Sequence, residues 1–131
     1  NMTRNAKQFI TEYQFKQDRR RKGRLLDWVK VGDVYISRLT LKDKAIIGNL
    51  YYRSTDVVFF VEKGKIKTKF VQAITEEEKE MVVGPGDGII HLPPYVAFSF
   101  KNIRVKESVL IMISDKPLRS KDDKEFIIYE E

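Results

Sequence analysis

The chain has 131 residues, of which 42% are hydrophobic, and it carries a formal net charge of +6 without any cysteine. This length and composition suit one domain with a single packed core, and the lack of cysteine excludes disulfides, thiolate metal sites and cysteine nucleophiles. The sequence shows no apolar leader and no run of about 18 apolar residues, so we expect a cytoplasmic protein that makes no contact with membranes.

The positive charge is concentrated in the first part of the chain. Residues 1–30 contain nine Lys or Arg against three Asp or Glu, whereas the remaining 101 residues contain 16 of each kind. The segment "RRRKGR" (19–24) is ordinarily a solvated basic arm, and the alternative is contact with the phosphates of a ligand or a nucleic acid. The sequence predicts a basic arm and first strand over 1–30, followed by one domain over 31–131.

The pattern along the chain predicts an all-β protein. We expect a short helix around 6–13, and then runs of β-branched and aromatic residues separated by turn formers such as "KDK", "GPGDG" and "SDKP". Many short strands without helical periods between them favour an antiparallel sandwich or barrel. The predicted strand segments are "VYISRLTL" (34–41), "VVFFVEKGKIKTKF" (57–70), "EMVVGPGDGIIHLPP" (80–94), "VAFSF" (96–100), "SVLIMIS" (108–114) and "FIIYE" (126–130).

The run "KGKIKTKF" (63–70) predicts a strand with one wet face and one buried face. Its lysines alternate with Ile66, Thr68 and Phe70, which is the period of a pleated strand. A hairpin would bring the acidic "TEEEKE" (75–80) opposite these lysines, where opposite charges stabilise a strand pair by roughly a few tenths of a kcal/mol. We interpret both segments as solvated structure.

Two blocks of sequence resemble the conserved motifs of the cupin family. The first is "GNLYYRSTDVVFFVEKGKI" (48–66), which contains a glycine, an acid at Asp56 and a hydrophobic strand ending in "VEKGKI". The second is "VVGPGDGIIHLPPYVAFSFKN" (82–102), in which "PGD", a strand, "LPP" and a closing "KN" keep the family order. The resemblance implies a double-stranded β-helix, the cupin jelly-roll barrel, with a helical or extended N-terminal arm.

The resemblance also implies where a metal would bind. The positions of the three histidines and the carboxylate of metal-binding cupins fall here on Leu50, Tyr52, Asp56 and Phe98. Side chains at i and i+2 of a strand share a face, which lets such ligands enter one barrel. Leucine and phenylalanine offer no lone pair, and a neutral phenol is a poor ligand beside imidazole. We therefore expect no metal and no other cofactor at this centre.

The single histidine, His91, cannot restore the ligand set, because it precedes the expected ligand position at 98 by seven residues. A hydrogen-bonded structural or rim histidine is the ordinary interpretation. The alternative is a general base that reaches a ligand from the rim of the barrel.

The barrel interior is the candidate binding site. It is either filled by its own side chains or open as an apolar cleft, in which the Tyr52 hydroxyl and the Asp56 carboxylate are the polar contacts. The candidate ligand-binding residues are Leu50, Tyr52, Asp56, Phe60, Phe98 and Met112.

Within the cupins, the chain is similar to the metal-independent epimerases and ketoisomerases that act on deoxythymidine-diphosphate sugars. The similar phrases are "RRRKGRLLDWV" (19–29), "TD…FFVEKGKI" and "PPY". Those enzymes use histidine and tyrosine to move a proton beside a ketone and basic residues to hold the diphosphate, but here the matched histidine positions are Leu50 and Tyr52. The resemblance therefore implies binding of a small organic molecule, above all a sugar or sugar nucleotide, more than catalysis.

Two alternative functions stay open. A sugar-nucleotide isomerase or epimerase would need a substituted base, for which Asp56, Tyr52 and His91 are the candidates, because burial can raise the pKa of a carboxyl toward neutrality. A nucleic-acid or protein interaction module would use the basic arm instead. With each function we expect a homodimer, formed through the N-terminal or C-terminal strand, because exposed edge strands are often covered by a symmetric copy.

Overall fold

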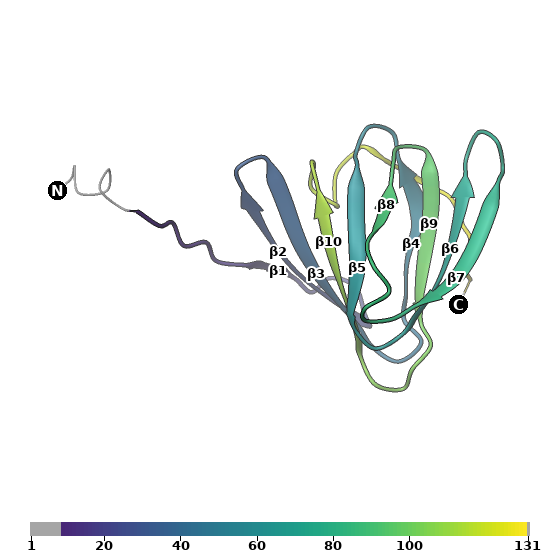
Figure 1. Cartoon of the computed structure of the whole chain (residues 1–131), viewed down its shortest axis with the longest axis horizontal. Helices are drawn as coiled ribbons and strands as arrows, with labels where there is room; N and C mark the ends of the chain where they lie inside the picture. Colours follow the sequence, from purple (N-terminus) through teal and green to yellow (C-terminus); the bar gives the residue numbers. More distant parts are fainter. Residues whose placement is uncertain (1–8, 131) are drawn as a thin grey trace.

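The computed structural model describes residues 9–130, which form two antiparallel sheets packed face to face (Figure 1). We call the sheet with strand order β1-β2-β3-β10-β5-β8 sheet A and the sheet with order β11-β4-β9-β6-β7 sheet B. The strands are β1 (Lys16–Asp18), β2 (Arg24–Val31), β3 (Val34–Leu41), β4 (Ile46–Tyr52), β5 (Val57–Lys63), β6 (Ile66–Gln72), β7 (Glu78–Val83), β8 (Ile90–Leu92), β9 (Val96–Asn102), β10 (Ser108–Ser114) and β11 (Asp123–Glu125).

The core lies between the two sheets, and inner strands such as β5 and β10 alternate buried and partly exposed residues. In β5, for example, Val57, Phe59 and Val61 are buried while Val58 and Phe60 are not. Aromatic side chains from both sheets meet in the centre, and the rings of Phe59 and Phe100 lie 4.7 Å apart between centroids. Such tilted aromatic pairs contribute about 1 kcal/mol beyond the area they bury.

Most of the predicted strands are confirmed. The segment 34–41 is β3, and the segment 57–70 forms β5 and β6 around a turn that contains Gly64. The lysines of β6 do face the acidic segment, since Lys69 pairs with Glu78 at 3.2 Å and Lys67 lies 3.8 Å from Glu80. The all-β prediction therefore holds for the described residues.

The predicted strand 126–130 is wrong. The last strand is β11, and the residues after it are bound by the side chain of Asn49, whose backbone φ of 57° marks a kink in β4. Asn49 Oδ1 accepts hydrogen bonds from the amides of Ile128 and Tyr129, and Asn49 Nδ2 donates to the Tyr129 carbonyl. One side-chain amide thus replaces the strand ladder that the apolar pattern predicted.

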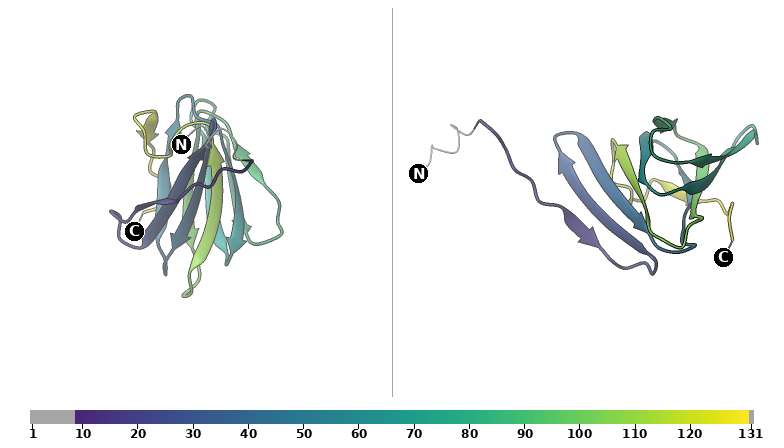
Figure 2. Two further views of the ribbon diagram at one scale, coloured as in Figure 1. Left: turned by 90° about the vertical axis from the view of Figure 1, so that its left-hand side faces the viewer. Right: turned by 60° about the horizontal axis from the view of Figure 1, so that its bottom comes forward.

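The N-terminal arm runs away from the sheets (Figure 2). Residues 9–15 form neither helix nor strand, so the helix expected around 6–13 does not occur in its described part; residues 6–8 lie outside the described residues. The expected boundary between 30 and 31 falls inside β2, which pairs with β3 from Arg24 opposite Leu41 to Val31 opposite Val34. No helix between residues 9 and 130 is long and apolar enough to cross a membrane.

A buried amide, Asn102, ties the ends of several strands together. Its Nδ2 donates to the carbonyls of Leu41, Lys42 and Lys106, each at 3.0 Å, and its Oδ1 accepts from Ser108 Oγ at 2.7 Å. Asn102 is fully buried, so removing its side chain leaves these partners without water as a substitute.

We expect the substitution Asn102→Ala to lower the free energy of unfolding by about 3 kcal/mol, because several buried polar groups lose their partners at once. Urea denaturation followed by circular dichroism measures the loss. A loss within experimental error would show that the Asn102 hydrogen bonds do not hold the strand ends together.

Candidate functional site

A cavity of about 640 Å³ lies between the two sheets at one end of the barrel. Sheet A contributes β2, β3 and β10 to its wall, and sheet B contributes β4, β9 and β11. This volume is within the usual range for small-molecule sites. The apolar part of the wall consists of Leu26, Leu39, Ile47, Leu50, Phe98, Met112 and Leu118.

Four of the six predicted ligand contacts line this cavity: Leu50, Tyr52, Phe98 and Met112. Phe60 does not, because it points to the outer face of β5, and its neighbour Phe59 takes the inward position in the core. A strand alternates its side chains, so an error of one residue moves a side chain to the opposite face of the sheet.

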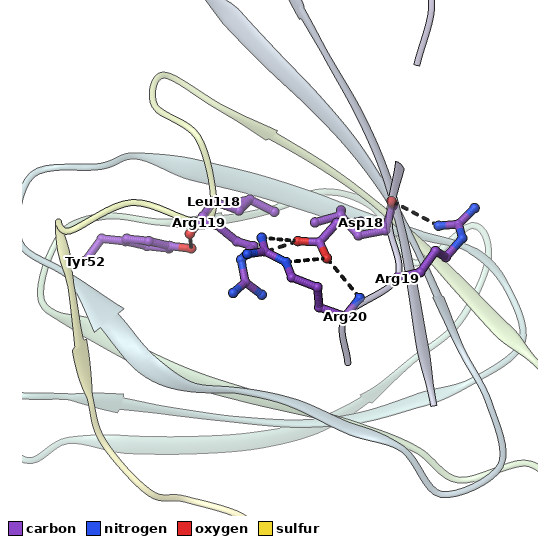
Figure 3. Close-up of polar contacts among 7 residues, drawn as sticks. Asp18, Arg19, Arg20, Tyr52, Leu118 and Arg119 are labelled. Carbon is purple, nitrogen blue, oxygen red and sulfur yellow. Dashed lines mark hydrogen bonds and ion pairs between the residues drawn. The ribbon is translucent and has the colours of Figure 1, made fainter. Parts of the chain in front are cut away.

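The Tyr52 side chain is fixed in place by a hydrogen bond and by burial. Its hydroxyl donates a hydrogen bond to the carbonyl of Leu118 at 2.7 Å, and its side chain is 5% exposed (Figure 3). Burial raises the pKa of the Tyr52 phenol well above its ordinary value. At neutral pH the phenol is therefore protonated, and its proton is directed at the backbone rather than into the cavity.

Asp56 and His91 form a pair outside the cavity. Asp56 Oδ1 lies 2.8 Å from His91 Nε2, and the two side chains are 53% and 56% exposed. The pair sits where β5 meets β8, the edge strand of sheet A. The three candidate catalytic groups are thus not brought together, since Tyr52 faces the cavity and the other two face solvent.

Basic residues surround the cavity. Arg20, Arg21 and Arg24 come from β2 and the turn before it, and Arg119 and Lys121 come from the loop between β10 and β11. The sequence indicated the first three as part of "RRRKGR", but it gave no signal for the other two, which lie almost 100 residues further along the chain. Asp123 is the acid among the residues that line the cavity.

Among these basic residues, Arg24 stands out because its guanidinium is buried without hydrogen-bond partners for two of its nitrogens among the described residues. Its Nε and Nη2 atoms are buried and have no hydrogen-bond partner in the described part of the chain. Burial lowers the pKa of the Arg24 guanidinium, and the nearby charges of Arg21 and Arg119 lower it further. Arginine nevertheless stays charged in proteins. A buried cation with unused donors is costly unless an anion accepts its hydrogen bonds.

The buried carboxylate of Asp18 holds two of these basic residues, Arg20 and Arg119, in place (Figure 3). It accepts hydrogen bonds from Arg20 Nε at 3.0 Å and Arg20 Nη2 at 2.7 Å, and Arg119 Nε lies 3.3 Å away. These hydrogen bonds, with that from the Arg20 amide, hold the pKa of Asp18 far below its ordinary value, and the charge of Arg119 adds to the effect. Asp18 thereby joins β1 to the loop that carries Leu118 and Arg119.

The residues at the expected metal position do not fit a metal. Leu50 and Phe98 have no donor atom, the Tyr52 hydroxyl is directed at a carbonyl, and Asp56 lies outside the cavity. Among residues 9–130, no group of three or more His, Cys, Asp or Glu side chains could hold a metal ion.

Asp122 anchors the loop that closes the cavity. Its carboxylate accepts hydrogen bonds from Thr55 Oγ1 at 2.6 Å, from the Ser54 amide at 2.9 Å and from Ser54 Oγ at 2.8 Å. The Thr55 hydrogen bond and those from Ser54 lower the pKa of Asp122 from its ordinary 3.8 to about 2. The loop of residues 116–121 is thus tied to the turn between β4 and β5.

We expect the stabilisation by Asp122 to be complete above pH about 4 and to disappear as the pH falls toward about 2, because its pKa is lower in the folded state. The difference in unfolding free energy between the wild type and Asp122→Asn, measured by urea denaturation at several pH values, should therefore shrink over that range. A difference that stays constant as the pH falls would contradict the role of the charged carboxylate.

Comparisons with known proteins identify the fold. No family model and no curated protein sequence matches the chain. Among solved structures, the capsular polysaccharide assembling protein CapF from Staphylococcus aureus is similar with a TM-score of 0.75 and 17% identity, over 94% of this chain and 34% of that one. An oxalate oxidase in complex with the substrate analogue glycolate is similar with a TM-score of 0.64 and 12% identity, over 72% and 51% of the two chains.

A third similar structure is Drosophila melanogaster CENP-C bound to CAL1, with a TM-score of 0.61 and 19% identity. The match covers 78% of this chain and 76% of that one. This chain thus spans about a third of the CapF chain but most of the CENP-C chain. These similarities confirm the predicted fold: residues 9–130 form an all-β protein with the jelly-roll fold of cupins.

Proposed function

We propose that this cupin-fold protein acts by binding and not by catalysis, and that its cavity takes an anionic organic molecule. The observation that carries the proposal is Arg24, whose buried Nε and Nη2 donors have no partner at the wall of a largely apolar cavity. A phosphate or carboxylate would accept both hydrogen bonds in the forked geometry that a guanidinium favours. The apolar wall would then hold the uncharged part of the molecule.

A sugar nucleotide fits this combination, as the sequence resemblance implies. Its diphosphate would lie against Arg21, Arg24 and Lys121, and its sugar or base would contact Leu50 and Phe98. Arg20 and Arg119 are already paired with Asp18, so they are less available to a ligand. The cavity volume of about 640 Å³ also suits a ligand of this size.

The isomerase alternative has less support. Proton transfer next to a carbonyl needs a base within about 3 Å of the proton that it removes. Asp56 and His91 lie outside the cavity, and the Tyr52 phenol is protonated and bonded to Leu118. The cavity therefore lacks the sequence-predicted base that this reaction would require.

We expect thymidine diphosphate-glucose to bind the protein in isothermal titration calorimetry and free glucose not to bind, because the charged group supplies the contact with Arg24. The substitution Arg24→Gln should weaken binding by at least about tenfold, since a charge-assisted hydrogen bond contributes roughly 1.5–3 kcal/mol. The control substitution Arg104→Gln, which changes an arginine outside the cavity, should leave the affinity for the nucleotide unchanged. No binding of the nucleotide, or equal binding to the Arg24 variant, would count against the proposal.

A protein-interaction module is the second candidate function. The CENP-C structure of similar length is bound to another protein, CAL1, and this chain carries an arm of exposed apolar side chains at Phe9, Ile10, Tyr13 and Phe15. The basic segment contributes less than its sequence suggests, because Arg19 and Arg20 are paired with Asp27 and Asp18. These two guanidinium groups are therefore less free to bind phosphates, which favours a protein partner over a nucleic acid.

We expect a short fluorescent DNA duplex to show no change in anisotropy with the protein at about 50 mM salt, where counterion release most favours binding. Because the paired arginines offer few free charges, binding should be absent even under this condition. Tight binding that weakens steeply as salt is raised would restore the nucleic-acid interpretation of residues 19–24.

A further inference from the structure

The turns at the two ends of the sandwich differ in charge. At one end, which we call the basic end, the turns hold nine Lys or Arg against three Asp or Glu. At the opposite end the turns hold four Lys or Arg against six Asp or Glu. The turns of the basic end are 19–23, 42–45, 64–65, 84–89 and 103–107, and those of the opposite end are 32–33, 53–56, 73–77, 93–95 and 115–122.

The strand register brings the five turns of the basic end together. Across sheet A, Leu41 at the end of β3 lies between Arg24 at the start of β2 and Ser108 at the start of β10. Across sheet B, the start of β6 lies between the end of β9 and the end of β7. The positive charge of the chain is therefore concentrated at one end of the fold, although its residues are scattered along the sequence.

The buried side chain of Asn102 fixes several of these turns relative to one another. Its Nδ2 donates to the carbonyls of Lys42 and Lys106, which lie in two different turns. Ser108 Oγ, which donates to Asn102 Oδ1, also accepts a hydrogen bond from the Lys65 amide at 3.1 Å. The backbones that carry these three lysines are thus held as one platform.

Most cations of the basic end have no anionic partner. Arg19 and Arg20 are paired with Asp27 and Asp18, but the other seven form no ion pair with a carboxylate among residues 9–130. A set of unpaired cations on fixed turns attracts a polyanion or an anionic surface. The exposed members of this set are Arg21, Lys22, Lys42, Lys44, Lys65 and Lys106.

Two aliphatic side chains project among these cations. Ile103 is 46% exposed and Val105 is 81% exposed, and they alternate with Arg104 and Lys106 in the loop after β9. In Figure 1 this loop extends furthest at the lower end of the sandwich. The Arg104 amide donates to Asn102 Oδ1 at 3.1 Å, so the loop is anchored at its base. The basic end therefore presents an apolar tip surrounded by positive charge.

A bilayer with anionic headgroups matches this arrangement. Its negative headgroups would meet Lys42, Lys44 and Lys106, while Ile103 and Val105 would enter the boundary between headgroups and acyl chains. A nucleic acid offers the same negative charge but no apolar layer beneath it. The projecting loop would hold its phosphates away from the surrounding lysines, so the geometry favours the lipid surface.

We propose that the protein attaches to anionic lipid surfaces through its basic end, with Ile103 and Val105 placed in the headgroup layer. The sequence alone predicted no contact with membranes, because the charge comes from five separate turns that only the fold brings together. The contact is independent of ligand binding, since Lys42, Lys106 and Val105 do not line the cavity.

Co-sedimentation with lipid vesicles tests the proposal. At about 100 mM salt the wild type should bind phosphatidylcholine vesicles that contain about 30% phosphatidylserine, and it should not bind phosphatidylcholine alone. The double variant Lys42→Gln/Lys106→Gln should bind about 25-fold more weakly, because each cation near an anionic surface strengthens binding about fivefold. The matched control Lys79→Gln/Lys124→Gln, at exposed positions on β7 and β11, should stay within about twofold of the wild type.

The apolar tip is tested separately from the charge. Val105→Ser keeps every charge and should weaken vesicle binding at least about threefold, whereas Ile74→Ser, at an exposed residue of the opposite end, should not. No binding to the anionic vesicles would overturn the proposal, as would equal affinities of the Lys42–Lys106 variant and its control. Wild-type affinity of Val105→Ser, or a DNA duplex that binds more tightly than the vesicles, would show a partner that recognises charge alone.

Discussion

The buried carboxylate of Asp18 is the interaction on which the candidate site depends. It binds Arg20 from the turn after β1 and Arg119 from the loop after β10, and these two segments are otherwise distant in the chain. Leu118 precedes Arg119 in that loop, and its carbonyl accepts the hydrogen bond of the Tyr52 hydroxyl. The arginines at the mouth of the cavity and the loop that orients Tyr52 are therefore joined through one buried anion.

This arrangement organises the polar end of the jelly-roll interior. Asp18 binds two arginines, Arg20 and Arg119, and holds them in place, while Arg24 has buried donors without a partner among the described residues. An apolar cavity beside an unsatisfied cation favours a ligand that is charged at one end and apolar at the other. Of the candidate catalytic groups, the Tyr52 hydroxyl is bonded to the Leu118 carbonyl, and the Asp56–His91 pair lies outside the cavity.

Much of the fold could be predicted from the sequence because strand alternation is local. The segment 34–41 alternates clearly and forms β3 with those bounds, and the lysines of β6 indicated its wet face. The prediction failed for 126–130, where the single side chain of Asn49 captures the backbone. It also failed for Phe60, because an apolar pair such as Phe59 and Phe60 does not show which residue faces inward.

The site could be predicted only in part, because some of its residues lie on strands with a local pattern and others reach it through long-range contacts. Leu50, Tyr52 and Phe98 line the cavity because these family positions lie on the inward faces of β4 and β9, and Met112 lines it from β10. Arg119 reaches the cavity through a long-range ion pair, which no local pattern encodes.

Whether Arg24 holds a ligand can be observed at the side chain itself. In a nitrogen–proton NMR titration with thymidine diphosphate-glucose, the Arg24 Nε–H resonance should shift in proportion to the ligand bound, while that of Arg104 stays in place. A nucleotide that binds without moving the Arg24 resonance would show that Arg24 does not hold the ligand.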